Sequence, residues 1–331
     1  MTLAALSSIA DIAGLEIGHF TDLRRPTGCT VVIARAGAVA GVDVRGAAPG
    51  TRETDLLAPT NLVDRVHAVV LAGGSAWGLE AATGVVRWLE EQGVGMLVGP
   101  ARLPLVPSAV LFDLLVGDCA IRPDALAGYA ACQAATTTAP VQGNVGAGAG
   151  ATVGKVFGIE RAMKGGIGTA SVTVDGVTVA ALIACNALGD VIDPETARPI
   201  AGARTADGEQ LADTRRALLA GQAAKPLIAG TNTTIGVIAT DAVITKIQAT
   251  RLAQMGHDGL ARSINPVHTM SDGDTLFALG TGASGRSLGM MTLGTMAAEA
   301  TAMAVVRAVR AAHGITVDGL RLPSIADLGP H

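Results

Sequence analysis

Aromatic residues are scarce in this sequence. Two Trp, one Tyr and four Phe are the whole aromatic content of its 331 residues, which include 43 glycines. Proteins that bind single-stranded nucleic acid stack its bases on aromatic rings, and proteins that bind its phosphates carry an excess of Lys and Arg. The formal net charge here is −4. The composition therefore argues against nucleic acid as a partner.

Long hydrophobic runs are also missing, although 49% of the residues are apolar. No uninterrupted apolar run reaches the roughly 18 residues that a membrane-spanning helix requires. The N-terminal segment has no basic residue ahead of its short apolar part, unlike a secretory signal. We expect a soluble cytoplasmic protein that makes no membrane contact.

Motifs for metal binding and for a serine-hydrolase elbow are absent as well. The four cysteines lie far apart with no CxxC pair, which is typical of reduced thiols. The six histidines show no zinc-ligand spacing, and there is no GxSxG sequence. The sequence therefore predicts neither a bound metal ion nor an α/β-hydrolase triad.

The chain does contain strand-like and helix-like segments, with no linker that would divide it. Asp175-Gly176 lies between two β-branched runs, which is the preferred two-residue turn of a β-hairpin. Further strands are predicted at residues 29–34, 38–44, 67–71, 106–111, 234–240 and 275–279, and helices at 78–92, 207–219, 247–261 and 287–312. An antiparallel hairpin among mixed elements favours a layered α/β or α+β protein over a purely parallel sheet.

Two glycine-rich segments have the composition of ligand-binding loops. In QGNVGAGAGATVGK, a Walker phosphate loop would need Gly in place of Ala149 and Ser or Thr in place of Val156. A dinucleotide loop would need a preceding strand, which is missing, so we expect no nucleotide cofactor. Two interpretations remain open: a tightly packed turn, or a loop whose backbone N–H groups approach a substrate and which ends in the cation Lys155. The second segment, LAGGSAWGLEAATG, is most simply a strand-to-helix connection that contains Trp77.

Two carboxylates, Asp272 and Asp274, precede a strand in MSDGDTLFALGTG. A calcium loop is excluded because Leu276 occupies its fifth position, and a phosphatase aspartate would follow an apolar strand rather than precede it. In an extended backbone, residues two apart point to the same side, so this pair could share a proton or orient an ammonium group. His268 lies close by in sequence, and we interpret it as a structural or supporting residue.

Asn232-Thr233 stands directly before the apolar strand of AGTNTTIGVIAT. Taken alone this is an ordinary strand entry, since Asn and Thr are common in turns. The functional interpretation is that the Thr233 hydroxyl attacks the preceding carbonyl and cuts the chain through an ester. The new terminal Thr would then carry both a nucleophile and, in its α-amine, a general base.

Taken together, these motifs resemble the N-terminal-nucleophile aminopeptidases of the P1 family. That family includes L-aminopeptidase/D-esterase, β-peptidyl aminopeptidases and 6-aminohexanoate (nylon) oligomer hydrolases. The resemblance runs from PTGCTVVIA to the C-terminal helix, and its motifs are LAGGSAWGLEAATGV, GNVGAGAGATVGK, ALIACNALGDVID, GTNTTIG and DGDTLFAL, in that order.

The resemblance implies a role for each of these residues. Cleavage would fall between Asn232 and Thr233, with Thr233 as the nucleophile. Asp272 and Asp274 would orient the nucleophile and its amine, where other branches of the family use a Ser-x-Glu pair. Lys155 would lie beside Thr233.

Two further residues follow from the same resemblance. Asn186 would donate a hydrogen bond to the oxyanion, an interaction generally worth a few kcal/mol of barrier. Trp77 would contact the substrate, at a position where relatives close to the nylon hydrolases carry Tyr. Because Trp donates one hydrogen bond but accepts none, this position would shape the pocket differently.

The fold implied by the resemblance is a four-layer αββα sandwich in a homotetramer. Residues 1–331 would form one self-processing domain, cut into an α chain of residues 1–232 and a β chain of residues 233–331. The hypothesis is an amide hydrolase that needs no cofactor and acts on α-peptides, β-peptides, D-amino esters or nylon oligomers. The alternative is a catalytically silent protein of the same fold that binds a small molecule.

Overall fold

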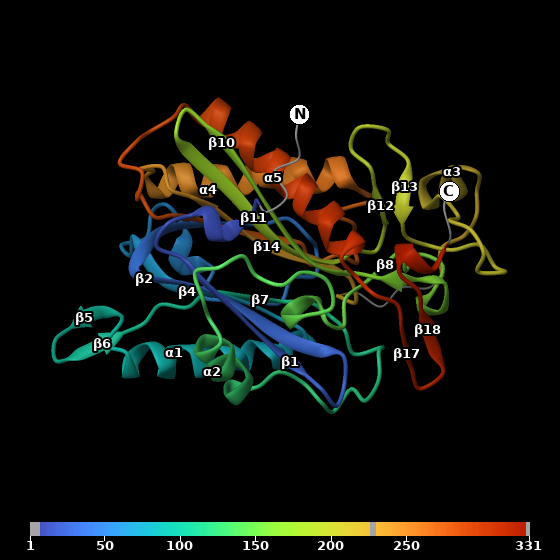
Figure 1. Ribbon diagram of the computed structural model, residues 1–331, viewed down its shortest axis with the longest axis horizontal. Coiled ribbons are helices and arrows are strands. Elements are labelled where there is room, and N and C mark those ends of the chain that lie inside the picture. Colours follow the sequence, from blue (N-terminus) through green and yellow to red (C-terminus); the bar gives the residue numbers. More distant parts are fainter. Residues whose placement is uncertain (1–6, 226–229, 329–331) are drawn as a thin grey trace.

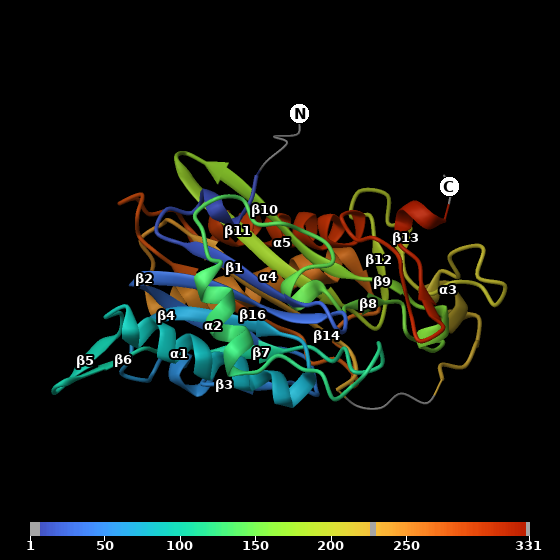
Figure 2. The ribbon, with the colours of Figure 1, turned by 60° about the horizontal axis from the view of Figure 1, so that its bottom comes forward.

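A computed structural model describes residues 7–225 and 230–328 as stacked layers of helices and strands. Figures 1 and 2 show the long helices α4 and α5 on one side of the strands and α1 and α2 on the other. The helices are α1 (Ala81–Glu91), α2 (Ala125–Gln133), α3 (Thr214–Leu219), α4 (Lys246–Ser263) and α5 (Met290–Arg310). None of the described helices is long and apolar enough to cross a membrane.

The strands between the helices belong to one hydrogen-bonded sheet with the order β10-β11-β14-β16-β2-β4-β7-β3, and β1 pairs with β2 outside this path. Their bounds are β1 (Glu16–Asp22), β2 (Thr27–Val44), β3 (Thr51–Arg52), β4 (Arg65–Ala72), β7 (Ser108–Val110), β10 (Gly166–Val174), β11 (Val177–Asn186), β14 (Thr233–Thr240) and β16 (Thr275–Gly280).

Strand β2 connects two layers of this sheet. Its first half pairs with β1 and its second half with β16, while β4 pairs with part of each half through a register shift between Ile33 and Ala38. Gly37 lies within this shift at φ +77°, a conformation that favours glycine. The two strands predicted at residues 29–34 and 38–44 are therefore one long strand, interrupted at this irregularity.

Three hydrophobic cores separate four layers. In β11 the odd positions, such as Ile183, face α4 and α5, while the even positions, such as Leu182, face the second strand layer. In β4, Val69 faces the same central core, whereas Val70 packs toward α1 and α2. This alternation confirms the predicted αββα sandwich, because each strand layer buries both of its faces.

Glycine and alanine allow these layers to approach closely. A Cβ atom at Gly168 of β10 would lie 2.2 Å from the carbonyl oxygen of Ala304 in α5, and one at Gly41 of β2 would lie 2.2 Å from the backbone nitrogen of Thr250 in α4. Larger residues at these contacts would separate helix from sheet. The scarcity of aromatic residues is thus a consequence of how closely the layers pack.

Of two local predictions, the hairpin is confirmed and the helix at residues 207–219 is partly wrong. The Asp175-Gly176 hairpin is confirmed, with φ of 51° and 73° at its two turn residues. The helix predicted at residues 207–219 is wrong in its first half. There the backbone turns back on itself through an Arg204–Leu211 bridge, and α3 begins only after Asp213, whose side chain accepts the Arg216 N–H.

Minor strands complete the fold. They form the pairs β5 (Met96–Val98) with β6 (Ala101–Leu103), β8 (Thr152–Val153) with β9 (Met163–Lys164), and β17 (Ile315–Val317) with β18 (Leu320–Leu322), and a small sheet of β12 (Asp190–Ile192), β13 (Pro199–Ala201) and β15 (Ile264–Asn265). Strand β8 lies within the glycine-rich segment, and the Thr152 N–H donates to Oδ1 of Asn186 at the end of β11.

Candidate active site

Thr233 is the first residue of β14, and neighbours from both sides of that strand converge on it. In the antiparallel register with β11, Thr233 lies opposite Asn186. On the other side, Asn232 forms a parallel bridge with Asp272, just ahead of β16. Residues far apart in the sequence thus meet at one end of three adjacent strands.

The Thr233 side chain is buried, with 3% of the residue exposed. Its Oγ1 donates a hydrogen bond to the carbonyl oxygen of Asn232, the carbonyl of the peptide bond that precedes it. The same oxygen accepts the N–H of Gly273 at 2.9 Å. A buried hydroxyl group and a backbone donor therefore both lie at the bond between residues 232 and 233.

Asp274 is held by three hydrogen bonds. Its Oδ1 accepts the N–H of Thr234 at 2.7 Å, and its Oδ2 accepts the backbone N–H of His268 at 3.2 Å and the ring Nδ1–H of His268 at 2.7 Å. The side chain of Asp274 is thus fixed in position, one residue beyond the backbone nitrogen of Thr233.

Asp272 has a different environment. Its Oδ2 accepts the N–H of Thr269 at 2.7 Å. Burial and the nearby carboxylate of Asp274 raise the pKa of Asp272. Two carboxyl groups, of which Asp272 has the raised pKa, therefore flank Gly273, an arrangement suited to holding or moving a proton.

Lys155 links the glycine-rich segment to Asn186. Its Nζ donates to the carbonyl oxygen of Thr152 at 3.0 Å, to that of Asn186 at 2.9 Å and to Oδ1 of Asn186 at 2.9 Å. Burial lowers the pKa of Lys155 to about 7, while the carboxylates of Asp272 and Asp274 act in the opposite direction. Three acceptors match the three N–H bonds of an ammonium group, so each proton of the charged form has a partner.

Asn186 is oriented by this lysine and by the backbone. Its Oδ1 also accepts the N–H of Thr152 at 2.9 Å, and its Nδ2 donates to the carbonyl oxygen of Phe112 at 3.0 Å. Because an amide nitrogen has two N–H bonds, one remains after the bond to Phe112. Asn186 can therefore donate to an additional oxygen without losing its anchors.

The glycine-rich segment is a packed turn, which decides between the two interpretations of it. The N–H groups of Gly146 and Ala147 are bound by the Thr21 and Thr30 hydroxyls. A second buried lysine, Lys164, donates from Nζ to three carbonyl oxygens of the region, those of Gly148, Ala151 and Gly165, at 2.8–2.9 Å. The segment places Lys155, and its Gly146 and Ala147 N–H groups are already bound within the protein.

Trp77 lies apart from the groups that touch Thr233. It belongs to a short 3₁₀ segment, Ser75–Glu80, between β4 and α1, and 56% of it is exposed. Its ring stacks under the Arg122 guanidinium at 4.4 Å. The same connection is anchored by the N–H of Gly74 on Asp113, the neighbour of the Phe112 that holds Asn186. Trp77 is thus exposed on a loop that is tied to the site.

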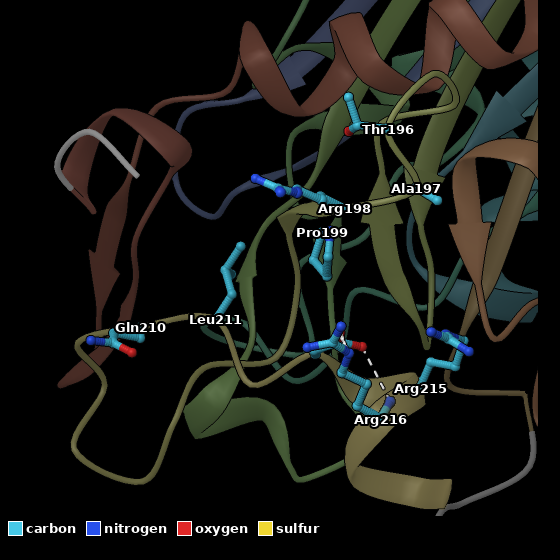
Figure 3. Close-up of a pocket in the computed structure, with 9 residues that line it drawn as sticks. Thr196, Ala197, Arg198, Pro199, Gln210, Leu211, Arg215 and Arg216 are labelled. Atoms are coloured by element: carbon cyan, nitrogen blue, oxygen red, sulfur yellow. Dashed lines mark hydrogen bonds and ion pairs between the residues drawn. The ribbon is translucent and has the colours of Figure 1, made fainter.

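The cavity drawn in Figure 3 lies elsewhere, beside β13 and α3. It has a volume of about 590 Å³, and its lining includes Arg198, Arg215 and Arg216, of which Arg216 pairs with Asp213 at 3.2 Å. None of the residues around Thr233 lines it. Within the described ranges no group of three or more His, Cys, Asp or Glu residues is arranged to hold a metal ion.

Sequence reasoning missed the backbone groups of the site. Gly273 contributes an N–H and Phe112 a carbonyl, and neither contribution depends on a side chain that a motif would display. The glycine between Asp272 and Asp274 was the one available signal, because glycine indicates that something approaches the backbone closely.

Comparison with known proteins completes the description of the site. The model of peptidase family S58 matches residues 7–321. The chain belongs to this family. Because the S58 family model matches almost the whole chain, the protein is a peptide or amide hydrolase. The following relatives also indicate this activity.

Two relatives illustrate the range of named activities. An uncharacterized aminopeptidase of Mycobacterium leprae is 46% identical over 303 residues, which cover 85% of this chain and 80% of the relative. A 6-aminohexanoate-oligomer endohydrolase of Paenarthrobacter ureafaciens is 34% identical over 273 residues, covering 82% and 74% respectively.

Solved structures show the same fold. A Burkholderia sp. β-aminopeptidase has a TM-score of 0.72 at 24% identity, with 98% of this chain and 92% of that chain covered. The L-aminopeptidase D-Ala-esterase/amidase of Ochrobactrum anthropi, described as a variant of the Ntn hydrolase fold, has a TM-score of 0.71 at 20% identity, with 96% and 90% covered. The predicted N-terminal-nucleophile fold is confirmed.

His268 gives a first prediction for this S58 hydrolase. Replacing it with Ala removes the ring donor from Asp274, and a hydrogen bond to a charged group contributes about 1.5–3 kcal/mol. We expect kcat/KM for an aminoacyl p-nitroanilide to fall at least tenfold. His268→Asn is the matched control, because Asn tolerates the φ of +55° at this position and retains a donor. An Ala variant as active as wild type would show that His268 does not position Asp274.

Proposed function

We propose that the protein is a self-processing amide hydrolase whose nucleophile is Thr233. The observation that carries the proposal is the buried Thr233 hydroxyl lying on the carbonyl of the Asn232–Thr233 bond. An ordinary strand entry has no need for a buried hydroxyl, a backbone donor and two carboxylates at one peptide bond.

Self-cleavage follows from this placement. Thr233 Oγ1 attacks the carbonyl carbon of Asn232, a C–O bond forms and the C–N bond breaks, and the hydroxyl proton passes to the leaving amine. Water then hydrolyses the ester, which leaves a carboxylate on Asn232 and a free α-amine and hydroxyl on Thr233. No cofactor or metal is required for either step.

Substrate hydrolysis repeats the same chemistry on an external amide. The α-amine of Thr233, with an unperturbed pKa near ~8, accepts the hydroxyl proton while Oγ1 attacks the substrate carbonyl. Asp274 holds the backbone beside that amine, and the remaining N–H of Asn186 stabilises the oxyanion. The acyl-enzyme on Oγ1 is then released by water.

The two pieces would stay together after the cut. β14 and β16 from the predicted β chain lie in the sheet between β11 and β2 from the predicted α chain. α4 and α5 cover the same layer and share its core. Separation would expose that core and two sheet edges, so residues 1–232 and 233–331 act as one unit.

The substrate we propose is a small amide or peptide with a free amino end. The buried nucleophile favours small substrates, and the named relatives span aminopeptidases and an oligomer endohydrolase. A panel of L-aminoacyl p-nitroanilides, β-peptides and 6-aminohexanoate oligomers distinguishes these classes. The silent-binding alternative predicts hydrolysis of none of them, although Thr233, Lys155 and Asn186 are all present.

The homotetramer stays a prediction. Sedimentation would distinguish a tetramer from a single protomer of 33.0 kDa.

Denaturing mass measurement tests the proposal directly. Purified wild-type protein is expected to give two pieces, of 232 and 99 residues, with Thr233 at the N-terminus of the smaller one. Pieces that begin at another residue would place the nucleophile elsewhere.

A further inference from the structure

The carbonyl oxygen of Asn232 has a backbone donor aimed at it before any reaction begins. The N–H of Gly273 lies 2.9 Å from this oxygen. The contact belongs to the parallel bridge between Asn232 and Asp272, so sheet geometry fixes it without any flexible side chain. A donor at 2.7–3.1 Å from the oxygen that gains charge is the arrangement of an oxyanion hole.

The residues on both sides of Gly273 are held in place. The carbonyl of Asp272 accepts the N–H of Ala48 at 2.9 Å, and the carbonyl of Asp274 accepts the N–H of Gly46 at 3.1 Å. A donor fixed at both ends does not need to reorganise when the carbonyl it faces becomes tetrahedral.

The absence of a side chain at Gly273 is also explained by this geometry. A Cβ atom there would lie 2.9 Å from Oγ1 of Thr233 and 2.6 Å from the carbonyl oxygen of Ala48. Any side chain would push against the nucleophile or against the segment that clamps the loop. Glycine is therefore the residue that allows the N–H to approach the bond that is cut.

In the uncut chain, the Asn186 side chain forms its hydrogen bonds with groups other than the Asn232 carbonyl. Its amide nitrogen donates to the carbonyl of Phe112, and its amide oxygen accepts from Lys155 and from the backbone of Thr152. The donor recorded at the carbonyl of Asn232 belongs to Gly273, on the opposite side of β14 from Asn186.

We infer that the Gly273 N–H is the oxyanion donor for self-cleavage, and that it is separate from Asn186, which serves substrate hydrolysis. The inference rests on the proposed function. During attack, negative charge develops on the carbonyl oxygen of Asn232, and the N–H of Gly273 stabilises it. After the cut this oxygen becomes part of the Asn232 carboxylate, and the Gly273 N–H takes no part in substrate hydrolysis.

Replacing Gly273 by glycolic acid, through nonsense suppression, tests the inference. The substitution turns the N–H into an ester oxygen, which cannot donate, and adds no bulk beside Thr233. The matched control carries the same substitution at Gly285, whose N–H donates to the Gly282 carbonyl at 3.0 Å in an exposed turn. Intact mass against time gives the rate of self-cleavage for each protein.

We expect self-cleavage to slow by about 10²- to 10³-fold with the ester at Gly273 and to be unchanged with the ester at Gly285. Once the slow protein is fully cut, its kcat/KM should lie within about threefold of wild type, which also shows that it folded. Cleavage of both ester proteins at the wild-type rate would overturn the role of Gly273 alone. Equal losses in cleavage and hydrolysis would overturn the separation from Asn186. A wild-type chain that is never cut would contradict self-cleavage itself, and the donor role with it.

Discussion

Replacing Thr233 with Val is expected to leave a single uncut chain without amide hydrolase activity. Val keeps the branched shape at a position that is 3% exposed in β14, so the strand and its core contacts should survive. What is lost is the hydroxyl that lies on the Asn232 carbonyl. Loss of a protease nucleophile lowers kcat by about 10⁶-fold, and here the loss also prevents release of the α-amine.

Thr233→Ser is the control for this substitution. Ser keeps the hydroxyl and loses only a methyl group, so the chain should still be cut and should still hydrolyse amides. Denaturing mass and p-nitroaniline release, measured on the same preparations of both variants, give the comparison. A Val variant that is cut to completion would require another nucleophile and would remove Thr233 from both reactions.

The second large effect is expected at Lys155. Lys155→Met removes a buried amine whose pKa responds to Asp272 and Asp274, and it removes one anchor of Asn186. Loss of an oriented oxyanion donor lowers kcat by about 10²- to 10³-fold. We expect that loss in kcat/KM, together with slow or incomplete self-cleavage.

Lys246→Met is the matched control for Lys155→Met. Nζ of Lys246 also makes three hydrogen bonds, to the backbone carbonyls of Leu56, Asn61 and Val63 at 2.7–3.0 Å, but Lys246 lies at the start of α4. The control should lose stability and remain fully cut and active. Equal activities for the two Met variants would show that Lys155 acts only through folding.

Local features of the fold were predictable because their causes are local. Asp175-Gly176 forms its hairpin because a two-residue turn with positive φ at both positions needs residues that tolerate it. The continuity of β2 across Gly37 was not predictable in this way. This continuity depends on β4 pairing with both halves of β2 and on β16 pairing with the second half. Which strands will pair cannot be inferred from the sequence of one strand alone.

The candidate site shows the same difference between local features, which could be predicted, and long-range contacts, which could not. Side chains such as Lys155 and Asp274 could be proposed because the motifs that contain them resemble those of a known family. Their contacts depend on register: Asn186 lies beside Lys155 and opposite Thr233 only because β11 pairs with β14 in one particular alignment. The N–H of Gly273 could not be inferred from a side chain, since any residue but proline supplies one.

The central claim is that activity depends on the cut between Asn232 and Thr233. The most direct test follows freshly translated wild-type protein over time, measuring the cut fraction by intact mass and amide hydrolysis in the same samples. Activity is predicted to rise in proportion to the 99-residue piece that begins with Thr233, and to be zero before any of that piece forms. Full activity in a sample that is still one chain of 331 residues would contradict the account.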